Sequence, residues 1–276
     1  MVENLLAPLQ FAFIQNALII SVLLSIAVGV IGTLIVVHKM VFLSGGVAHS
    51  TYGGIGLAIF CGFSPLLGAG LFGVIAALLM WWVVVREKQR SDMMIGVIWA
   101  VGMAFGVALI DLSGGVSGDL MSYLFGSLVV VERSDIWLFA LLDTACIAWI
   151  SAFYHKLLAI SFDEKFAQTK GINVKTHNLV LLLFASLAVV MAIRAVGLML
   201  VMALLTIPVW LAERTAKTLW QTMIVASVLT LGFLWLGLAL AYALNITSGA
   251  AVIGVAAAAF VIGEVVRAAR RKTTLI

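Results

Sequence analysis

Residues 11–37 read FAFIQNALIISVLLSIAVGVIGTLIVV and contain no charged side chain. A run of this length exceeds the roughly 20 apolar residues that a helix needs to cross the hydrocarbon core of a bilayer. It is too long for the apolar segment of a signal peptide, and no basic residue precedes it. The run therefore predicts a first membrane-spanning helix.

The whole chain shares this character. Of its 276 residues, 64% are hydrophobic and 10% are charged, and the mean hydropathy is +1.23. Soluble proteins are about 45–50% apolar and about 25% charged, so this chain has too few charges to cover a water-facing surface. Its long apolar runs also differ from the alternating segments of an outer-membrane barrel. We expect an all-α fold, a polytopic transmembrane helix bundle that forms one domain over residues 1–276.

The apolar segments predict individual spans. The clear ones are 11–37, 47–62, 65–85, 93–111, 136–155, 220–244 and 249–266. A further stretch, 178–211, is interrupted at Arg194-Ala195, which is consistent with two short helices or with one span and a re-entrant segment. The prediction is therefore eight or nine membrane helices.

Basic residues indicate the orientation. All lysines and arginines except Arg133 and Arg194 lie in five segments, 38–46, 86–92, 156–177, 213–219 and 267–276. The positive-inside rule makes these segments, and hence the C-terminus, cytoplasmic. Nine helices would place the N-terminus outside and eight would place it inside. The net charge of +4 follows from this bias and from attraction to anionic lipid, so we expect no nucleic-acid partner.

The sequence also bears on catalysis. Residues 43–47 and 112–116 begin like the LSGGQ signature of ABC-type ATPases, but the chain has no GxxxxGK[ST] phosphate-binding loop. A membrane-embedded serine hydrolase is disfavoured because Ser248-Gly249 lacks the first glycine of a GxSxG motif. We therefore expect that the chain is not an enzyme and holds no permanent cofactor.

Ionisable residues within predicted spans are candidates for function, because they are costly unless they face the bundle interior or a wet cavity. His49 lies near the start of the second span, and a neutral imidazole is a good ligand for a divalent transition metal. The alternative is a hydrogen bond to a neighbouring helix. Asp143 lies in the span 136–155 and would either line a polar path or pair with a hydroxyl. Glu264 has Arg267 three residues later, which predicts an ion pair at the membrane surface.

Residues 196–217 read VGLMLVMALLTIPVWLAERTAK. Pro208 is expected to kink or end the span. A short helix at about 209–218 would then stand on the cytoplasmic face as a docking element for a soluble partner, the alternative being an interfacial turn. Its exposed charged side chains would be Glu213, Arg214 and Lys217.

Several motifs occur in a characteristic order. They are Ser44 to His49 followed by Gly53 to Ala58, Leu124-Phe125-Gly126, Phe162-Asp163 through Ala167 to Gly171, Val196 through Pro208 to Ala212, and Ser248-Gly249. Together, over about 200 residues, they resemble the permease family of ABC importers for zinc, manganese and iron. The segment ending at Ala212 is the most specific of them.

The resemblance implies a permease in the cytoplasmic (inner) membrane of a prokaryote. It would pair with a second permease copy, most simply as a homodimer, around a central pathway for a divalent metal ion. Two cytoplasmic ABC ATPase subunits and an extracytoplasmic metal-binding protein would complete the importer. His49 would lie on the metal pathway, and the element at 209–218, following Pro208, would couple to the ATPases.

One position departs from the family pattern. Family members carry an aspartate four residues before the histidine, on the same helix face, a spacing suited to joint metal coordination. Here that position is Gly45. A single imidazole remains in place of a carboxylate–imidazole pair. Two copies of His49 across a dimer axis would still form a pathway site, but the loss of the carboxylate weakens the case for a tightly coordinating, manganese-like site.

The alternative function is an ATP-independent secondary transporter or channel, with His49 and Asp143 forming the polar path. Whether transport requires a separate ATPase chain distinguishes the two hypotheses.

Overall fold

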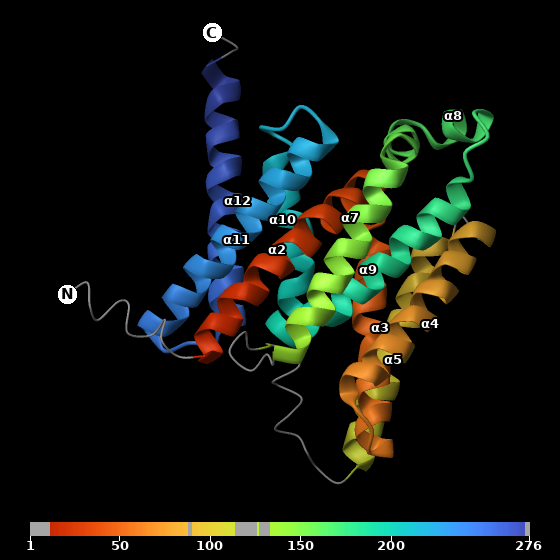
Figure 1. The fold of residues 1–276 in the computed structure, drawn as a ribbon, viewed down its shortest axis with the longest axis vertical. Coiled ribbons are helices and arrows are strands. Elements are labelled where there is room, and N and C mark those ends of the chain that lie inside the picture. The colour runs from red at the N-terminus through yellow and green to blue at the C-terminus, as the bar shows by residue number, and fades with distance from the viewer. Residues whose placement is uncertain (1–11, 88–89, 114–125, 127–132, 274–276) are drawn as a thin grey trace.

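The computed structural model describes residues 12–87, 90–113, 126 and 133–273, and every regular element in these ranges is a helix (Figure 1). The helices are α2 (Ala12–Val37), α3 (Val41–Cys61), α4 (Pro65–Arg86), α5 (Ser91–Leu112), α7 (Arg133–Phe162), α8 (Glu164–Thr169), α9 (Val174–Val196), α10 (Leu198–Ala212), α11 (Leu219–Leu244) and α12 (Ser248–Thr273). The predicted all-α fold is confirmed for this part of the chain.

Seven of the described helices are long and apolar enough to cross a membrane: α2, α4, α5, α7, α9, α11 and α12. Helix α10 is also apolar but has only 15 residues. Helix α3 is long enough but is not among the seven, because its glycines, hydroxyls and His49 lower its hydropathy. Length and composition thus support a multi-pass membrane bundle.

Helix α3 is enclosed by protein. It packs mainly against α4 and α5 and also contacts α9, α10 and α2. Glycines permit the close approach: a Cβ on Gly54 would collide with the backbone of Gly68 on α4, and one on Gly56 with the backbone of Gly106 on α5. Because protein rather than lipid surrounds α3, the helix tolerates polar side chains that a lipid-facing helix would not.

The break in the 178–211 stretch lies at Gly197, three residues beyond the predicted position at Arg194. Gly197 has φ 81°, a backbone conformation that strains any residue with a Cβ, and it separates α9 from α10. Gly126, the described residue of the Leu124-Phe125-Gly126 motif, contacts Gly197; Leu124 and Phe125 lie outside the described residues. The stretch therefore forms two helices, but only α10 is short, because α9 is long enough to span a membrane.

The predicted short helix at 209–218 is wrong. Helix α10 continues through Pro208 to Ala212, residues 213–218 form a turn, and α11 begins at Leu219. Pro208 removes one i→i−4 hydrogen bond inside α10, but the helix continues for one further turn before it ends. Thr218 then adopts an extended backbone and its side chain accepts a hydrogen bond from the Gln221 N–H, which starts a new helix.

Several helices extend beyond the predicted spans. Helix α3 begins at Val41 rather than 47, α7 runs over Arg133–Phe162 rather than 136–155, and α12 continues to Thr273. The residues added to α7 and α12 include charged ones, which helices can place in the interface while their stems remain in apolar surroundings. Helix α8, the turn between α10 and α11, and the C-terminal end of α12 all lie at the top of the bundle in Figure 1.

Candidate functional site

His49 lies two turns into α3 and stacks on Trp99 of α5, with ring centroids 4.1 Å apart and an interplanar angle of 15°. Its Nδ1 is buried and has no hydrogen-bond partner among the described residues. Leaving a buried polar atom unpaired costs about 1–3 kcal/mol. The stacked ring is therefore held in place while one nitrogen remains available, as a transient metal ligand requires.

Gly45, one helical turn before His49, is covered by α10. A Cβ on Gly45 would lie 2.8 Å from Met202 Cε and 3.2 Å from Met202 Sδ. On the other side, the Trp99 indole donates a hydrogen bond to Met103 Sδ at 3.1 Å. An aromatic ring therefore lies against His49, and two thioethers lie close to its neighbours Gly45 and Trp99.

Carboxylates are distant from this site. The helices that contact α3 carry acidic residues only near the ends of α5, at Asp92 and Asp111. At 1.5 Å of rise per residue, these lie about 10 Å and about 18 Å along the axis from Trp99. In the described parts of the chain, no group of three or more His, Cys, Asp or Glu could hold a metal ion. One protomer therefore offers His49 without a carboxylate partner.

Asp143 lies on α7 and is 5% exposed. Neither carboxylate oxygen has a hydrogen-bond partner among the residues that the structure describes, so the hydroxyl pairing considered from sequence is absent there. Helix α7 packs mainly against α2, with further contacts to α8 and α9, whereas His49 faces α5. The structure does not bring His49 and Asp143 together in one site.

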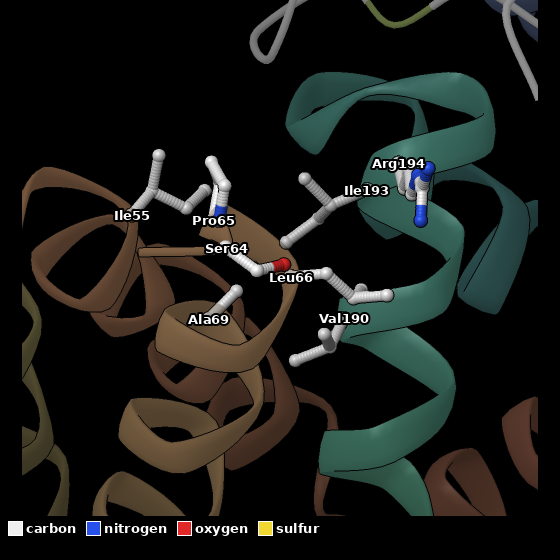
Figure 2. A pocket seen from close by; sticks show the side chains of 8 residues that line it. All are labelled: Ile55, Ser64, Pro65, Leu66, Ala69, Val190, Ile193 and Arg194. Atoms are coloured by element: carbon white, nitrogen blue, oxygen red, sulfur yellow. The ribbon is translucent and has the colours of Figure 1, made fainter. Parts of the chain in front are cut away.

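A cavity of about 130 Å³ lies between α3, α4 and α9, at the end of the bundle opposite α8 (Figure 2). Its polar lining groups are the Ser64 hydroxyl and the Arg194 side chain. Ile55, which lines it from α3, is six residues beyond His49, and at 100° per residue this places it on a different face of the helix. The cavity is therefore separate from the His49 site. In the sequence, this cavity was indicated only by Arg194, a charged residue within an apolar stretch.

At the opposite end, Arg214 is tied to α12. Its Nη2 lies 2.7 Å from Glu264 Oε1, its Nη1 donates to the Gly263 carbonyl at 2.9 Å, and its guanidinium carbon lies 3.2 Å from the centroid of the Trp210 ring. The predicted Glu264–Arg267 pair is also present, at 3.5 Å. Glu213, Arg214 and Lys217 are all exposed, as predicted, but Arg214 is bonded to α12.

Helix α8 is a second exposed element at this end. Asp163 caps its N-terminus by accepting hydrogen bonds from the N–H groups of Lys165 and Phe166. The side chains of Phe162 and Phe166 are 83% and 55% exposed. The sequence motif from Phe162 to Gly171 indicated a cytoplasmic loop but not this short helix with its exposed aromatic rings.

His38 joins α8 to the bundle. Its Nδ1 lies 3.3 Å from Asn178 Oδ1 and its Nε2 lies 2.8 Å from Ser161 Oγ. The Asn178 amide in turn donates to Glu164 of α8. Burial lowers the pKa of His38 below its ordinary value of 6.5, and outweighs the Asn178 hydrogen bond and the Glu164 charge, which raise it.

Residues 10–267 match the model of the ABC 3 transport family. The chain is 47% identical to "Uncharacterized membrane protein slr2045" of Synechocystis over 95% of this chain and 93% of that protein. It is 33% identical to the manganese transport system membrane protein MntC of Listeria monocytogenes, covering 92% and 90% of the two chains. It is 31% identical to the manganese import system permease protein ScaB of Streptococcus parasanguinis, covering 95% and 94%.

Solved structures give the same result. PsaBC from Streptococcus pneumoniae, solved in complex with Fab, superposes with a TM-score of 0.85 at 29% identity, covering 95% of both chains. An inward-facing metal-chelate type ABC transporter has a TM-score of 0.72 at 18% identity over 90% of this chain and 84% of the other, a likeness of fold alone.

Proposed function

Since this chain belongs to the ABC 3 transport family, we propose that it is the membrane-spanning permease of an ABC importer for a divalent transition metal ion, namely zinc, manganese or iron. The observation that carries the proposal is the match over residues 10–267 together with a buried, unpartnered imidazole nitrogen at His49. The metal is the cargo, and His49 is the residue that contacts it along the path. The chain itself is not an enzyme; ATP is hydrolysed on a separate subunit.

The topology we propose has nine membrane helices, with the N-terminus outside and the C-terminus in the cytoplasm. The long helices α2 to α5, α7 and α9 to α12 alternate in direction in Figure 1, so that α2 begins near the bottom of the view and α12 ends at the top. The connections at the top include Lys39, Arg90, Lys165 and Lys217. This distribution supports the orientation through the positive-inside rule.

The cytoplasmic ATPase subunits would dock at this basic end. The turn 213–218 carries Glu213 and Lys217, which are exposed, with Arg214 bound to α12 behind them. Exposed aromatic rings also lie at this end, those of Phe162, at the end of α7, and of Phe166, on α8. A soluble partner binds best where apolar anchors and charges lie together, so we assign the coupling surface jointly to the turn and to α8.

Two further partners, a second permease copy and a metal-binding protein, would bind away from the basic end. A second permease copy would complete the pathway, because the described residues of one protomer contain no group of three or more His, Cys, Asp or Glu that could hold a metal ion. An extracytoplasmic metal-binding protein would deliver the ion to the end that contains the Arg194 cavity.

The test is metal uptake into liposomes that contain the permease purified with its co-encoded ATPase and binding protein. We expect uptake that requires ATP, and its loss in His49→Ala and His49→Phe variants that still co-purify with the ATPase. A permease that purifies alone and transports without ATP would contradict the proposal in favour of a secondary transporter. Wild-type uptake by His49→Ala would contradict the role of His49.

A further inference from the structure

The contact between Gly45 and Met202 places a thioether on the same face of α3 as His49. Gly45 precedes His49 by four residues, so the two positions lie one above the other on the helix. Met202 Cε and Sδ come within 2.8 Å and 3.2 Å of where a Cβ on Gly45 would stand. The end of the methionine side chain therefore fills the space that a side chain at position 45 would occupy.

This arrangement keeps oxygen ligands away from His49. A carboxylate at position 45 would have to displace the Met202 methyl group, and a methionine offers only a soft sulfur in its place. Other acidic residues on the helices that contact α3 are confined to Asp92 and Asp111, near the two ends of α5. The His49 ring stacks on Trp99, which bonds to Met103, and Met202 covers Gly45 on the preceding turn of α3.

Divalent metal ions differ in the ligand atoms that they prefer. Carboxylate, carbonyl and water oxygens suit Mn²⁺, imidazole suits Zn²⁺, and Mn²⁺ has the lowest affinity of the divalent first-row series for a given site. Zn²⁺ binds histidine nitrogen readily and imposes no geometry through its d electrons. A pathway site built on imidazole without carboxylate therefore favours Zn²⁺ over Mn²⁺.

We propose that the Gly45–Met202 contact is the selectivity determinant of this permease and that the cargo is Zn²⁺ rather than Mn²⁺. This inference rests on the proposed function. Met202 acts as a positioning residue: by occupying the space over Gly45 it leaves His49 as the metal ligand from this turn of α3. In a two-fold dimer the partner contributes the same residue types, so dimerisation adds a second imidazole and no carboxylate from this position.

The test is competitive uptake of Zn²⁺ and Mn²⁺, supplied at equal free concentration, by the complete transporter in liposomes. We expect a Zn²⁺ to Mn²⁺ uptake ratio of about ten or more for the wild type, which corresponds to about 1.4 kcal/mol of selectivity. The double variant Gly45→Asp/Met202→Ala supplies a carboxylate and the room for it. Its Zn²⁺ to Mn²⁺ uptake ratio should fall at least about tenfold, which again corresponds to about 1.4 kcal/mol.

The matched control is Gly45→Asn/Met202→Ala, which has the same shape and no charge. Its ratio should stay within about threefold of the wild type, because an amide is a much weaker metal ligand than a carboxylate. Wild-type preference for Mn²⁺ would overturn the inference, as would equal shifts in the Asp and Asn variants. The wild-type ratio tests the choice of Zn²⁺ even if a variant does not assemble, and the variants test the role of the Gly45–Met202 contact. Absence of ATP-dependent uptake of either metal would contradict the proposed function instead.

Discussion

Arg194 Nη1 lies 2.6 Å from Asp135 Oδ1, and this ion pair joins the last turn of α9 to the first turn of α7. The Asp135 side chain is 1% exposed and that of Arg194 is 33% exposed. The pair stands next to Gly197, where α9 gives way to α10, and Arg194 also lines the cavity between α3, α4 and α9 (Figure 2). Arg194 therefore links three structural features at one end of the bundle.

Removal of Arg194 should destabilise the protein. In Arg194→Met, Asp135 keeps its burial but loses this cation. Breaking a buried pair costs about 3–5 kcal/mol, and the partial solvent contact of Arg194 favours the lower end, about 3 kcal/mol. The double variant Arg194→Met/Asp135→Asn removes both charges and should recover most of the loss. Thermal unfolding in mild detergent measures both effects, and equal stability of the wild type and Arg194→Met would contradict the prediction.

Replacement of Asp143 should increase stability and reduce metal uptake. Replacement by leucine removes a buried carboxylate without partners among the described residues, so Asp143→Leu should raise the free energy of unfolding by about 1–3 kcal/mol. A membrane-embedded acid that persists at this cost is expected to serve function, so metal uptake should fall at least about fivefold in the same variant. Melting temperature and liposome uptake are measured on one preparation.

Two variants control this experiment. Asp143→Asn keeps the size and removes the charge, and should also lose uptake. Asp143→Glu keeps the carboxylate and should retain uptake of the same order as the wild type. A leucine variant that is more stable and transports normally would show that Asp143 is not part of the polar path.

His38 should make stability depend on pH. Because burial lowers its pKa in the folded protein below 6.5, the unfolded state binds more protons between the two pKa values. The stability contribution is therefore complete above about pH 6.5, the ordinary histidine pKa, and is lost as the pH falls through the folded-state pKa. We expect the melting temperature to drop more between pH 7.5 and 5.5 in the wild type than in His38→Gln. His155→Gln, at an exposed position on α7, should follow the wild type, and equal slopes for all three proteins would refute the assignment.

Hydropathy predicted the membrane helices because each long apolar run must satisfy its own backbone in lipid, a condition local to the segment. The features that hydropathy did not predict depend on residues that are distant in the sequence. The break at Gly197 follows from its positive φ and its contact with Gly126, which no hydropathy window detects. The Glu264–Arg267 pair was predictable because both residues share a helix, whereas the bond from Arg214 to Glu264 crosses between helices.

In the candidate site too, the sequence predicted single residues but not the contacts between helices. His49 stands out in the sequence because an imidazole within an apolar helix is rare and costly. Its stacking on Trp99 and the approach of Met202 to Gly45 depend on how α5 and α10 pack on α3. Sequence therefore singled out His49 as a candidate but not the side chains around it.

The turn 213–218 yields the last prediction, because two of its basic residues have different surroundings. Lys217 is exposed, whereas Arg214 is bound to Glu264 and to the Gly263 carbonyl. Lys217→Glu should reduce transport per ATP hydrolysed at least about fivefold with an unchanged melting temperature, since surface charges contribute about 0–1 kcal/mol to stability. Transport and ATP hydrolysis are measured together in liposomes.

Arg214→Glu should also reduce coupling, but through loss of its bonds to α12, with a lower melting temperature. If Arg214 acts only by holding the turn, the exchange Arg214→Glu/Glu264→Arg re-forms the ion pair and should restore both stability and coupling to within about twofold, a difference comparable to the small energy of a partly exposed pair. Restored stability without restored coupling would instead indicate that Arg214 contacts the ATPase directly. No exchange at position 264 should rescue Lys217→Glu, because the structure gives Lys217 no ion pair with α12 in the described part of that helix.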